Sequence, residues 1–264
     1  MKNLLTIAGS DSSGGAGIQA DLKTFSAHQT FGMSVVTAVT AQSTRGVFAV
    51  QDVDPKMIRK QIEAVFEDIS VDGIKIGMVS QKETIQTIAE TLGKYPYQNL
   101  VVDPVMISKS GFDLLHPDAK AALIEYLLPM ATMVTPNLPE AEEITGMKID
   151  TPETMKKAAK KIHAMGPTYV LIKGGHLVGD AVDILFDGKD FTTYTGKRVV
   201  TKNTHGTGCT LSSAIAANLG KGEDIHTAVA MAKAYITTAI EHSFSIGKGP
   251  GPVHHFYDLY RREP

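Results

Sequence analysis

Short apolar runs alternate along this chain with segments of helical periodicity, and this alternation limits the possible folds more than any other feature. The runs predicted as strands are 4–8, 35–41, 74–78, 100–105 and 170–173. The patterns predicted as helices are 20–27, 83–92, 119–127, 211–219 and a segment that starts at Thr151-Pro152 and stops at Gly166. Because the strand candidates contain few polar residues, both of their faces are expected to be covered. The alternation therefore predicts an α/β fold with a mostly parallel central sheet and helices on both faces.

From Ala181 to Val200 the pattern changes to short strands separated by turns at Asp187-Gly188 and Thr195-Gly196. This change predicts hairpins that add a short antiparallel edge to the sheet. No Pro-, Ser- or Gly-rich linker and no internal repeat divides the 264 residues. We therefore expect residues 1–264 to form a single domain.

The composition argues against several functional classes. A net charge of −2 gives no basic footprint for nucleic acid. No apolar run approaches the ~20 residues of a membrane span, and the few apolar residues before Asp11 are too short for a signal peptide. A single cysteine cannot form an internal disulfide. We expect a cytoplasmic protein that binds a small molecule, with no nucleic acid and no membrane as partner.

The run His205-Gly206-Thr207-Gly208-Cys209 stands directly before the helical stretch 211–219. Its two glycines let the backbone approach a ligand, and the N–H groups of the first helical turn point at an approaching anion. The positive end of the helix would also lower the pKa of the Cys209 thiol, which makes Cys209 a candidate base or electrostatic partner. The alternative is a buried structural cysteine in a Gly-rich turn.

Lys173 ends an apolar strand and is followed by two glycines, so its ammonium group could bind a phosphate. A solvated lysine is the alternative. Asp103 lies near the end of the predicted buried strand 100–105. Burial of a carboxylate there costs folding free energy unless the carboxylate is paired or bound to a metal. Because both residues are expected outside the packed layers, their replacement is expected to spare folding.

Asn137 and Glu140 follow a short strand near Met133 and are expected at the same sheet edge as Asp103. The three side chains could share one hydrated Mg²⁺, which prefers oxygen ligands. Alternatively, Asn137 and Glu140 form a helix capping box. A phosphate grip, a metal candidate and a base candidate together indicate phosphoryl transfer.

Two further segments point to the same sheet edge. The loop Gly9–Gly17 follows the first strand and is neither a P-loop nor a G-x-G-x-x-G motif, so an ordinary turn explains it almost as well as a binding loop. Asp21 lies one turn into the next helix, where the helix dipole favours an acid in any case. Met78 ends a strand at this edge and is placed against a substrate ring, whereas the pair His254-His255 is expected at the surface or in a lid.

Together these segments resemble the hydroxymethylpyrimidine/phosphomethylpyrimidine kinases, a branch of the ribokinase-like superfamily, and the resemblance extends nearly from end to end. The motifs that carry it are Ala8–Asp21 (AGSDSSGGAGIQAD), Thr40-Ala41-Gln42, Asp103–Met106 (DPVM), Thr135–Leu138 (TPNL) with Glu140, and His205–Thr210 (HGTGCT). Much of the superfamily has an aspartate in place of Cys209, and a cysteine there is typical of this branch and of the similar bacterial pyridoxal kinases. The resemblance implies a ribokinase-like three-layer sandwich.

The resemblance also implies an activity: transfer of the ATP γ-phosphoryl group to 4-amino-5-hydroxymethyl-2-methylpyrimidine, then phosphorylation of the monophosphate to the diphosphate, for thiamin biosynthesis. ATP and Mg²⁺ are the implied cofactors, and a homodimer is the implied assembly. The implied pyrimidine pocket consists of Gly9, Asp21, Gln42, Met78 and Val105. The implied phosphate and metal groups are Asp103, Asn137 and Glu140 for Mg²⁺ and its waters, Lys173 for the ATP phosphates, and Gly206, Thr207, Gly208 and Cys209 for the transferring charge. The loop Ser108–Phe112 has the small residues of a closing flap.

Two other functions remain open from the sequence. A pyridoxal or pyridoxine kinase could use the same site, alone or as a second activity. A ligand-binding regulator could use a kinase fold without catalysis. The joint presence of Lys173, Asp103 and Cys209 argues against the regulator.

Overall fold

A nine-stranded mixed sheet runs through the computed structural model of the chain, which describes residues 1–106, 117–175 and 181–261. Its strands are β1 (Asn3–Asp11), β2 (Phe31–Ser43), β3 (Gly46–Asp52), β4 (Gly73–Ile76), β5 (Leu100–Val102), β6 (Met133–Val134), β7 (Tyr169–Lys173), β8 (Ala181–Phe186) and β9 (Phe191–Gly196). They lie in the order β3-β2-β1-β4-β5-β6-β7-β8-β9. The segment from β2 to β7 is parallel, and β3, β8 and β9 add antiparallel pairs at the two edges.

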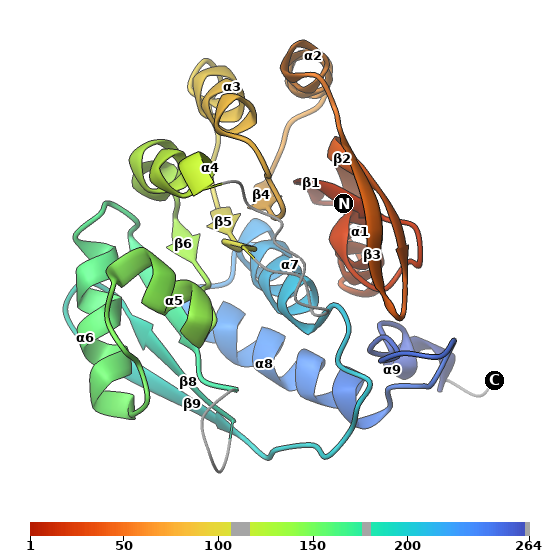
Figure 1. Cartoon of the computed structure of the whole chain (residues 1–264), viewed down its shortest axis with the longest axis vertical. Coiled ribbons are helices and arrows are strands. Elements are labelled where there is room, and N and C mark those ends of the chain that lie inside the picture. Colours follow the sequence, from red (N-terminus) through yellow and green to blue (C-terminus); the bar gives the residue numbers. More distant parts are fainter. Residues whose placement is uncertain (107–116, 176–180, 262–264) are drawn as a thin grey trace.

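Helices cover both faces of the sheet (Figure 1). They are α1 (Gly17–Ala27), α2 (Pro55–Phe66), α3 (Lys82–Leu92), α4 (Pro117–Ala122), α5 (Leu138–Thr145), α6 (Pro152–His163), α7 (Thr207–Gly220), α8 (Ile225–Glu241) and α9 (Tyr257–Tyr260), with a π-helical turn Leu123–Leu127 and a 3₁₀ turn Leu128–Met130. One apolar core forms beneath α2 to α6, and a second forms between the opposite face and α1, α7 and α8. The predicted three-layer α/β sandwich is confirmed.

The antiparallel part of the sheet is larger than predicted. The expected edge at residues 181–200 is present as β8 and β9, joined by a turn in which Gly188 has φ 92°. The opposite edge is also antiparallel, because β3 folds back on β2, and the prediction of a single such edge is therefore incomplete. Four of the seven residues of β3 are partly buried and three are exposed, and its apolar run at residues 47–50 is not among the runs predicted as strands.

The topology brings distant segments to one edge. The chain leaves β1 for β2 on one side and later returns to β4 on the other side, so the strand order reverses next to β1. The segments that follow β1, β4, β5, β6 and β7 all emerge at the carboxyl edge of the parallel strands, where α/β sheets bind their ligands. Among the described residues, none of the helices has both the length and the apolar character needed to cross a membrane.

Candidate active site

A cavity of about 910 Å³ opens at the carboxyl edge of the parallel strands. This volume suits small-molecule ligands. Twelve of the thirteen residues predicted for the site line it: Gly9, Gln42, Met78, Asp103, Val105, Asn137, Glu140, Lys173, Gly206, Thr207, Gly208 and Cys209. The expected flap Ser108–Phe112 lies outside the described residues.

Helix α7 begins at one wall of the cavity, and the glycine before it is required by geometry. Gly206 is the N-cap residue, has φ 79°, and makes no side-chain cap. A Cβ atom at this position would lie 1.8 Å from the carbonyl oxygen of Gly15. Any side chain would therefore push the Gly9–Gly17 loop away from the helix, and the start of α7 can open into the cavity only because residue 206 is glycine.

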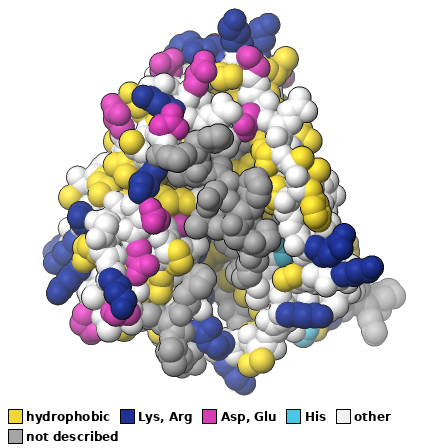
Figure 2. All heavy atoms as spheres, viewed as in Figure 1, with side chains coloured by type: hydrophobic (Ala, Val, Ile, Leu, Met, Phe, Trp, Pro, Cys, Tyr) yellow, Lys and Arg dark blue, Asp and Glu magenta, His cyan; other side chains and the backbone are white. Residues whose placement is uncertain are grey.

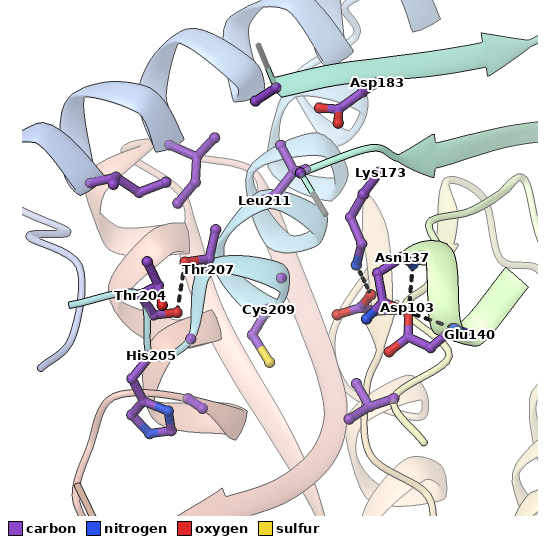
Figure 3. A pocket seen from close by; sticks show the side chains of 18 of the residues that line it. Asp103, Asn137, Glu140, Lys173, Asp183, Thr204, His205, Thr207, Cys209 and Leu211 are labelled. Carbon is purple, nitrogen blue, oxygen red and sulfur yellow. Dashed lines mark hydrogen bonds and ion pairs between the residues drawn. The ribbon is translucent and has the colours of Figure 1, made fainter. Parts of the chain in front are cut away.

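Cys209 lies on the first turn of α7, between the His205–Thr207 segment and the Asp103–Lys173 pair (Figure 3). Burial raises the pKa of its thiol to about 11; the ammonium group of Lys75 opposes this rise, and nearby carboxylates reinforce it. The expected lowering of the thiol pKa is therefore wrong for the free protein. Cys209 is partly buried at the cavity wall, and the stabilisation of a thiolate by the partial charge at a helix end is smaller than the free-energy cost of its desolvation.

Lys173 and Asp103 form an ion pair, with 2.7 Å between Nζ and Oδ1. Thr135 also donates to Asp103 Oδ1, at 3.2 Å. Burial would raise the pKa of Asp103, but the ammonium groups of Lys173 and Lys75 outweigh it and lower the value. Burial likewise opposes the charge of Lys173, and the carboxylates of Asp103 and Glu140 raise its pKa. The solvated-lysine alternative is wrong, because the ammonium group pairs with a buried carboxylate. This pairing argues against the expectation that either residue can be replaced without loss of stability.

Asn137 and Glu140 form the capping box of α5. The Asn137 side chain accepts from the Glu140 N–H at 2.9 Å, and the Glu140 carboxylate accepts from the Asn137 N–H at 2.8 Å. Burial raises the pKa of Glu140 to about 7, with Lys173 opposing the rise and Asp103 adding to it. The capping alternative is thus confirmed, and it places both side chains on the cavity wall.

The carboxylates fit Mg²⁺ only as partial ligands. In the described ranges, no cluster of three or more His, Cys, Asp or Glu side chains could hold a metal ion. Mg²⁺ in phosphoryl-transfer sites takes one or two carboxylates and completes its shell with waters and phosphate oxygens. Asp103 and Glu140 supply that number. The pKa of Glu140 is about 7, so a bound cation would favour its ionised form at neutral pH.

Asp21 is the exception among the predicted site residues, because it does not reach the cavity. It is fully buried behind the described lining and forms an ion pair with Lys75, with 2.9 Å between Nζ and Oδ1. Thr6 and Ser213 donate hydroxyl hydrogen bonds to it at 2.6 and 2.7 Å. The expected place of Asp21 in the pyrimidine pocket is therefore wrong for this arrangement, since α1 turns Asp21 into the layer between α7 and the sheet.

The sequence profile of the phosphomethylpyrimidine kinase family matches residues 11–254, nearly the whole chain. The chain belongs to this family. It is a kinase.

Individual relatives agree with this assignment. The hydroxymethylpyrimidine/phosphomethylpyrimidine kinase of Rhizobium meliloti is 54% identical over 97% of this chain and 98% of that protein. The thiamine biosynthesis bifunctional protein ThiED of Geobacter sulfurreducens is 51% identical over 96% of this chain, which spans only 52% of that longer protein. Among solved structures, an ADP complex of Bacillus subtilis pyridoxal kinase is 41% identical, covers 99% of this chain and 100% of its own, and superposes with a TM-score of 0.92.

Two side-chain pairs at the cavity, each with a buried aspartate, were not predicted. Asp183 accepts a hydrogen bond from the Gly174 N–H at 3.0 Å and forms an ion pair with Lys233 of α8, so it joins β8 to α8 beside the end of β7. Asp11 accepts from His205 at 2.8 Å and joins the Gly9–Gly17 loop to the segment before α7. An acid inside a Gly/Ser loop was the available signal for Asp11, whereas the partners of Asp183 lie too far apart in sequence to be found.

One histidine expected at the surface is also buried. His255 is 5% exposed, and its Nε2 lies 3.0 Å from the hydroxyl of Thr210 on α7. The C-terminal segment therefore packs against the helix that carries Cys209.

Asp11→Asn is expected to lower the free energy of unfolding at neutral pH. The difference in this free energy between the variant and the unchanged protein should become smaller below about pH 4. Burial would raise the pKa of Asp11, but hydrogen bonds from His205 and Ser13 lower it from 3.8 to about 2. Its carboxylate therefore stabilises the folded state above the unfolded pKa, and this contribution is lost as the pH falls toward 2. Urea unfolding at several pH values measures the difference, with the exposed Asp68→Asn as control. A difference that does not change with pH would contradict the prediction.

Proposed function

We propose that this kinase transfers the ATP γ-phosphoryl group to 4-amino-5-hydroxymethyl-2-methylpyrimidine and then converts the monophosphate to the diphosphate, as thiamin biosynthesis requires. The observation that carries the proposal is one cavity in which the start of α7 and the Lys173–Asp103 pair lie together with Gln42 and Met78. The start of α7 and Lys173 suit a phosphate group, and Gln42 and Met78 suit a flat polar ring.

The phosphate end supplies electrostatic stabilisation. Gly206, Thr207 and Gly208 would present backbone N–H groups to the transferring phosphoryl group, with Lys173 as a point charge. Cys209 would accept the proton of the substrate hydroxyl or stabilise the charge that develops there. Asp103, Asn137 and Glu140 would hold Mg²⁺ and its waters, and the ion would neutralise phosphate charge when bound.

The pyrimidine end is shaped by Gly9, Met78 and Gln42, with Val105 beside them. A Cβ atom on Gly9 would lie 2.2 Å from the Cε atom of Met78, so glycine allows the methionine methyl group to reach the cavity wall. The main chain of Gln42 is fixed by Ser12, whose hydroxyl both donates to its carbonyl and accepts from its N–H at 2.8 Å. A fixed backbone positions the Gln42 amide to read a substrate edge.

Gln42→Ala is expected to weaken use of the aminopyrimidine by roughly five- to 150-fold, the effect of a bidentate pair worth ~1–3 kcal/mol. A primary amide can pair at once with the exocyclic amine and the neighbouring ring nitrogen, a combination that pyridoxal lacks. Phosphorylation of pyridoxal should therefore change little. Steady-state kcat/KM for both substrates measures the split, and the exposed Gln51→Ala on β3 is the matched control.

Equal losses for both substrates, or no loss for the pyrimidine, would contradict the role of Gln42. The Thr40 hydroxyl lies 3.2 Å from the Gln42 Oε1 atom, so the local alternative is an amide held by its own strand. That alternative predicts a stability change without a change in substrate preference.

Pyridoxal phosphorylation is a second candidate activity, favoured by the close superposition on a pyridoxal kinase. Incubation with Mg-ATP and, in parallel, hydroxymethylpyrimidine, its monophosphate and pyridoxal, with products identified by mass, separates the activities. Formation of the pyrimidine diphosphate supports the main proposal. Turnover of pyridoxal alone would replace it, and binding without turnover would indicate a regulator.

We also propose a homodimer and a single functional domain over residues 1–264. All described strands belong to one sheet, which supports the single domain. Hydrophobic side chains gather on the side of the molecule where β2 lies (Figure 2), and Val39 and Phe48 of the β2–β3 hairpin are 54% and 64% exposed. Such exposed apolar area suits a protein contact. Light scattering tests the dimer, and a cytoplasmic location stays a prediction from the sequence.

A further inference from the structure

Lys75 is a fully buried cation that does not line the cavity. It extends from β4, is 0% exposed, and places its Nζ 2.9 Å from both carboxylate oxygens of Asp21 on α1. Gly77 leaves room for it, because a Cβ atom there would lie 2.6 Å from the Lys75 Nζ. Thr6 and Ser213 complete the hydrogen bonds of Asp21, so the carboxylate and with it the ammonium group are fixed in position.

The buried Lys75–Asp21 pair between α7 and the sheet has a high desolvation free energy. Taking a lysine and an aspartate out of water is penalised strongly, and well-packed apolar residues at such places are often as stabilising or more so. The neighbours Ile74 and Ile76 on β4 are fully buried and apolar. Stability alone therefore does not explain why β4 carries an ammonium group here.

The charges that surround Cys209 give a reason. The groups that act on its thiol are Lys75 from β4, Asp21 from α1, Asp103 after β5, Lys173 from β7 and the Gly17 N–H at the start of α1. Lys75 is the cation that favours the thiolate most, against burial and the two carboxylates. Burial disfavours the charge of Lys75 itself, but Asp21, Cys209 and Asp103 raise its pKa, so it remains an ammonium ion at neutral pH.

We propose that Lys75 is a positioning residue that acts through Cys209, as the fixed counter-charge for negative charge on the sulfur. When Cys209 ionises, its proton goes to water and the ammonium group stabilises the thiolate; when the thiolate accepts the substrate hydroxyl proton, that charge is neutralised. Lys75 keeps its protons throughout, and Asp21 holds it in place. The catalytic consequence rests on the proposed function. The effect on the thiol rests on the placement of the pair: Ser213, which donates to Asp21 at 2.7 Å, lies four residues after Cys209 on α7, so the two side chains lie on the same face of the helix.

Alkylation by iodoacetamide tests the proposal without requiring kinase activity. Cys209 is the single cysteine of the chain and lines the cavity, so the reaction reports on one thiol. At fixed pH the rate follows the thiolate fraction. Lys75→Met should lower the rate by about tenfold or more, and Asp21→Asn should raise it by a similar factor, as expected when one charge is removed from the partly buried surroundings of the thiol.

Opposite shifts are the decisive result, because both variants break the same ion pair and a purely structural role would move the rate in one direction. Lys75→Arg keeps the charge and should stay within about threefold of the unchanged protein. The exposed Lys82→Met is the control for general charge. If Lys75→Met does not fold, the comparison of Lys75→Arg with Asp21→Asn decides.

Shifts in the same direction, or an Asp21→Asn rate within about threefold of the unchanged protein, would overturn the proposal. In the kinase assay, Lys75→Met should lower kcat and leave KM for ATP close to its original value. Absence of any kinase activity in the unchanged protein would defeat the proposed function and leave the alkylation result standing, so the two failures are distinguishable.

Discussion

Replacement of Cys209 by alanine is expected to lower kcat by ~10²–10⁴-fold, the usual contribution of a general base, and to leave ATP affinity close to its original value. The backbone at the start of α7 and Gly206 before it are unchanged by the substitution. The charge or proton-accepting role of the thiol is lost. Turnover should therefore fall while ATP binding is kept, whereas unfolding would reduce both.

Nucleotide titration and steady-state kinetics on the same preparation measure this separation. Because burial raises the thiol pKa to about 11, a rate that depends on the thiolate should rise with pH from about pH 7 to about pH 10. The alanine variant should lose this slope. Turnover within a factor of about three of the unchanged protein would show that Cys209 is structural. Bound substrate should also slow thiol alkylation, since the hydroxymethyl group would lie over the sulfur.

Removal of one partner of the Lys173–Asp103 pair is expected to abolish phosphoryl transfer and also to reduce stability by ~3–5 kcal/mol. Asp103 is 2% exposed, so Lys173→Ala leaves a buried carboxylate that has lost its ion-pair partner and keeps side-chain hydrogen bonds from Thr135 and Ser212, with Lys75 as the remaining nearby cation. Asp103→Asn leaves Lys173 with a neutral partner. The catalytic loss should fall on the steps in which phosphate charge moves.

The double variant Lys173→Met, Asp103→Asn separates the two effects. It removes both charges, so the melting temperature should recover much of the loss while activity should not. Lys2→Ala breaks an exposed ion pair with Asp72 and should leave melting nearly unchanged. Normal specific activity in the folded fraction of either single variant would assign the pair an architectural role instead.

Much of the fold follows from local sequence patterns. Apolar runs placed β1, β2, β4, β5 and β7 within a few residues of their observed bounds. Thr151-Pro152 begins α6 with the side-chain cap expected of it, and the same logic identified the Asn137–Glu140 capping box. Such features depend on residues three or four apart, so the chain specifies them before any tertiary contact forms.

Site membership was also largely predictable. A residue that follows a parallel strand emerges at the carboxyl edge, so Met78, Asp103 and Lys173 were placed at the cavity by strand position alone. The antiparallel edge strand β3 was missed although residues 47–50 form a short apolar run. None of its residues is fully buried, and its place in the sheet comes from pairing with β2.

Protonation and pairing needed the tertiary structure. The sequence by itself determined that an acid, a lysine and a thiol meet at one sheet edge. Only the tertiary structure decided that Lys173 pairs with Asp103, that Asp21 turns away from the cavity toward Lys75, and that burial raises the pKa of Cys209. The physical reason is that the pKa values and ion pairs of these side chains depend on burial and on charged partners far away in the sequence. The two partners are 70 residues apart for Lys173–Asp103 and 54 residues apart for Lys75–Asp21, so no local sequence pattern indicates them.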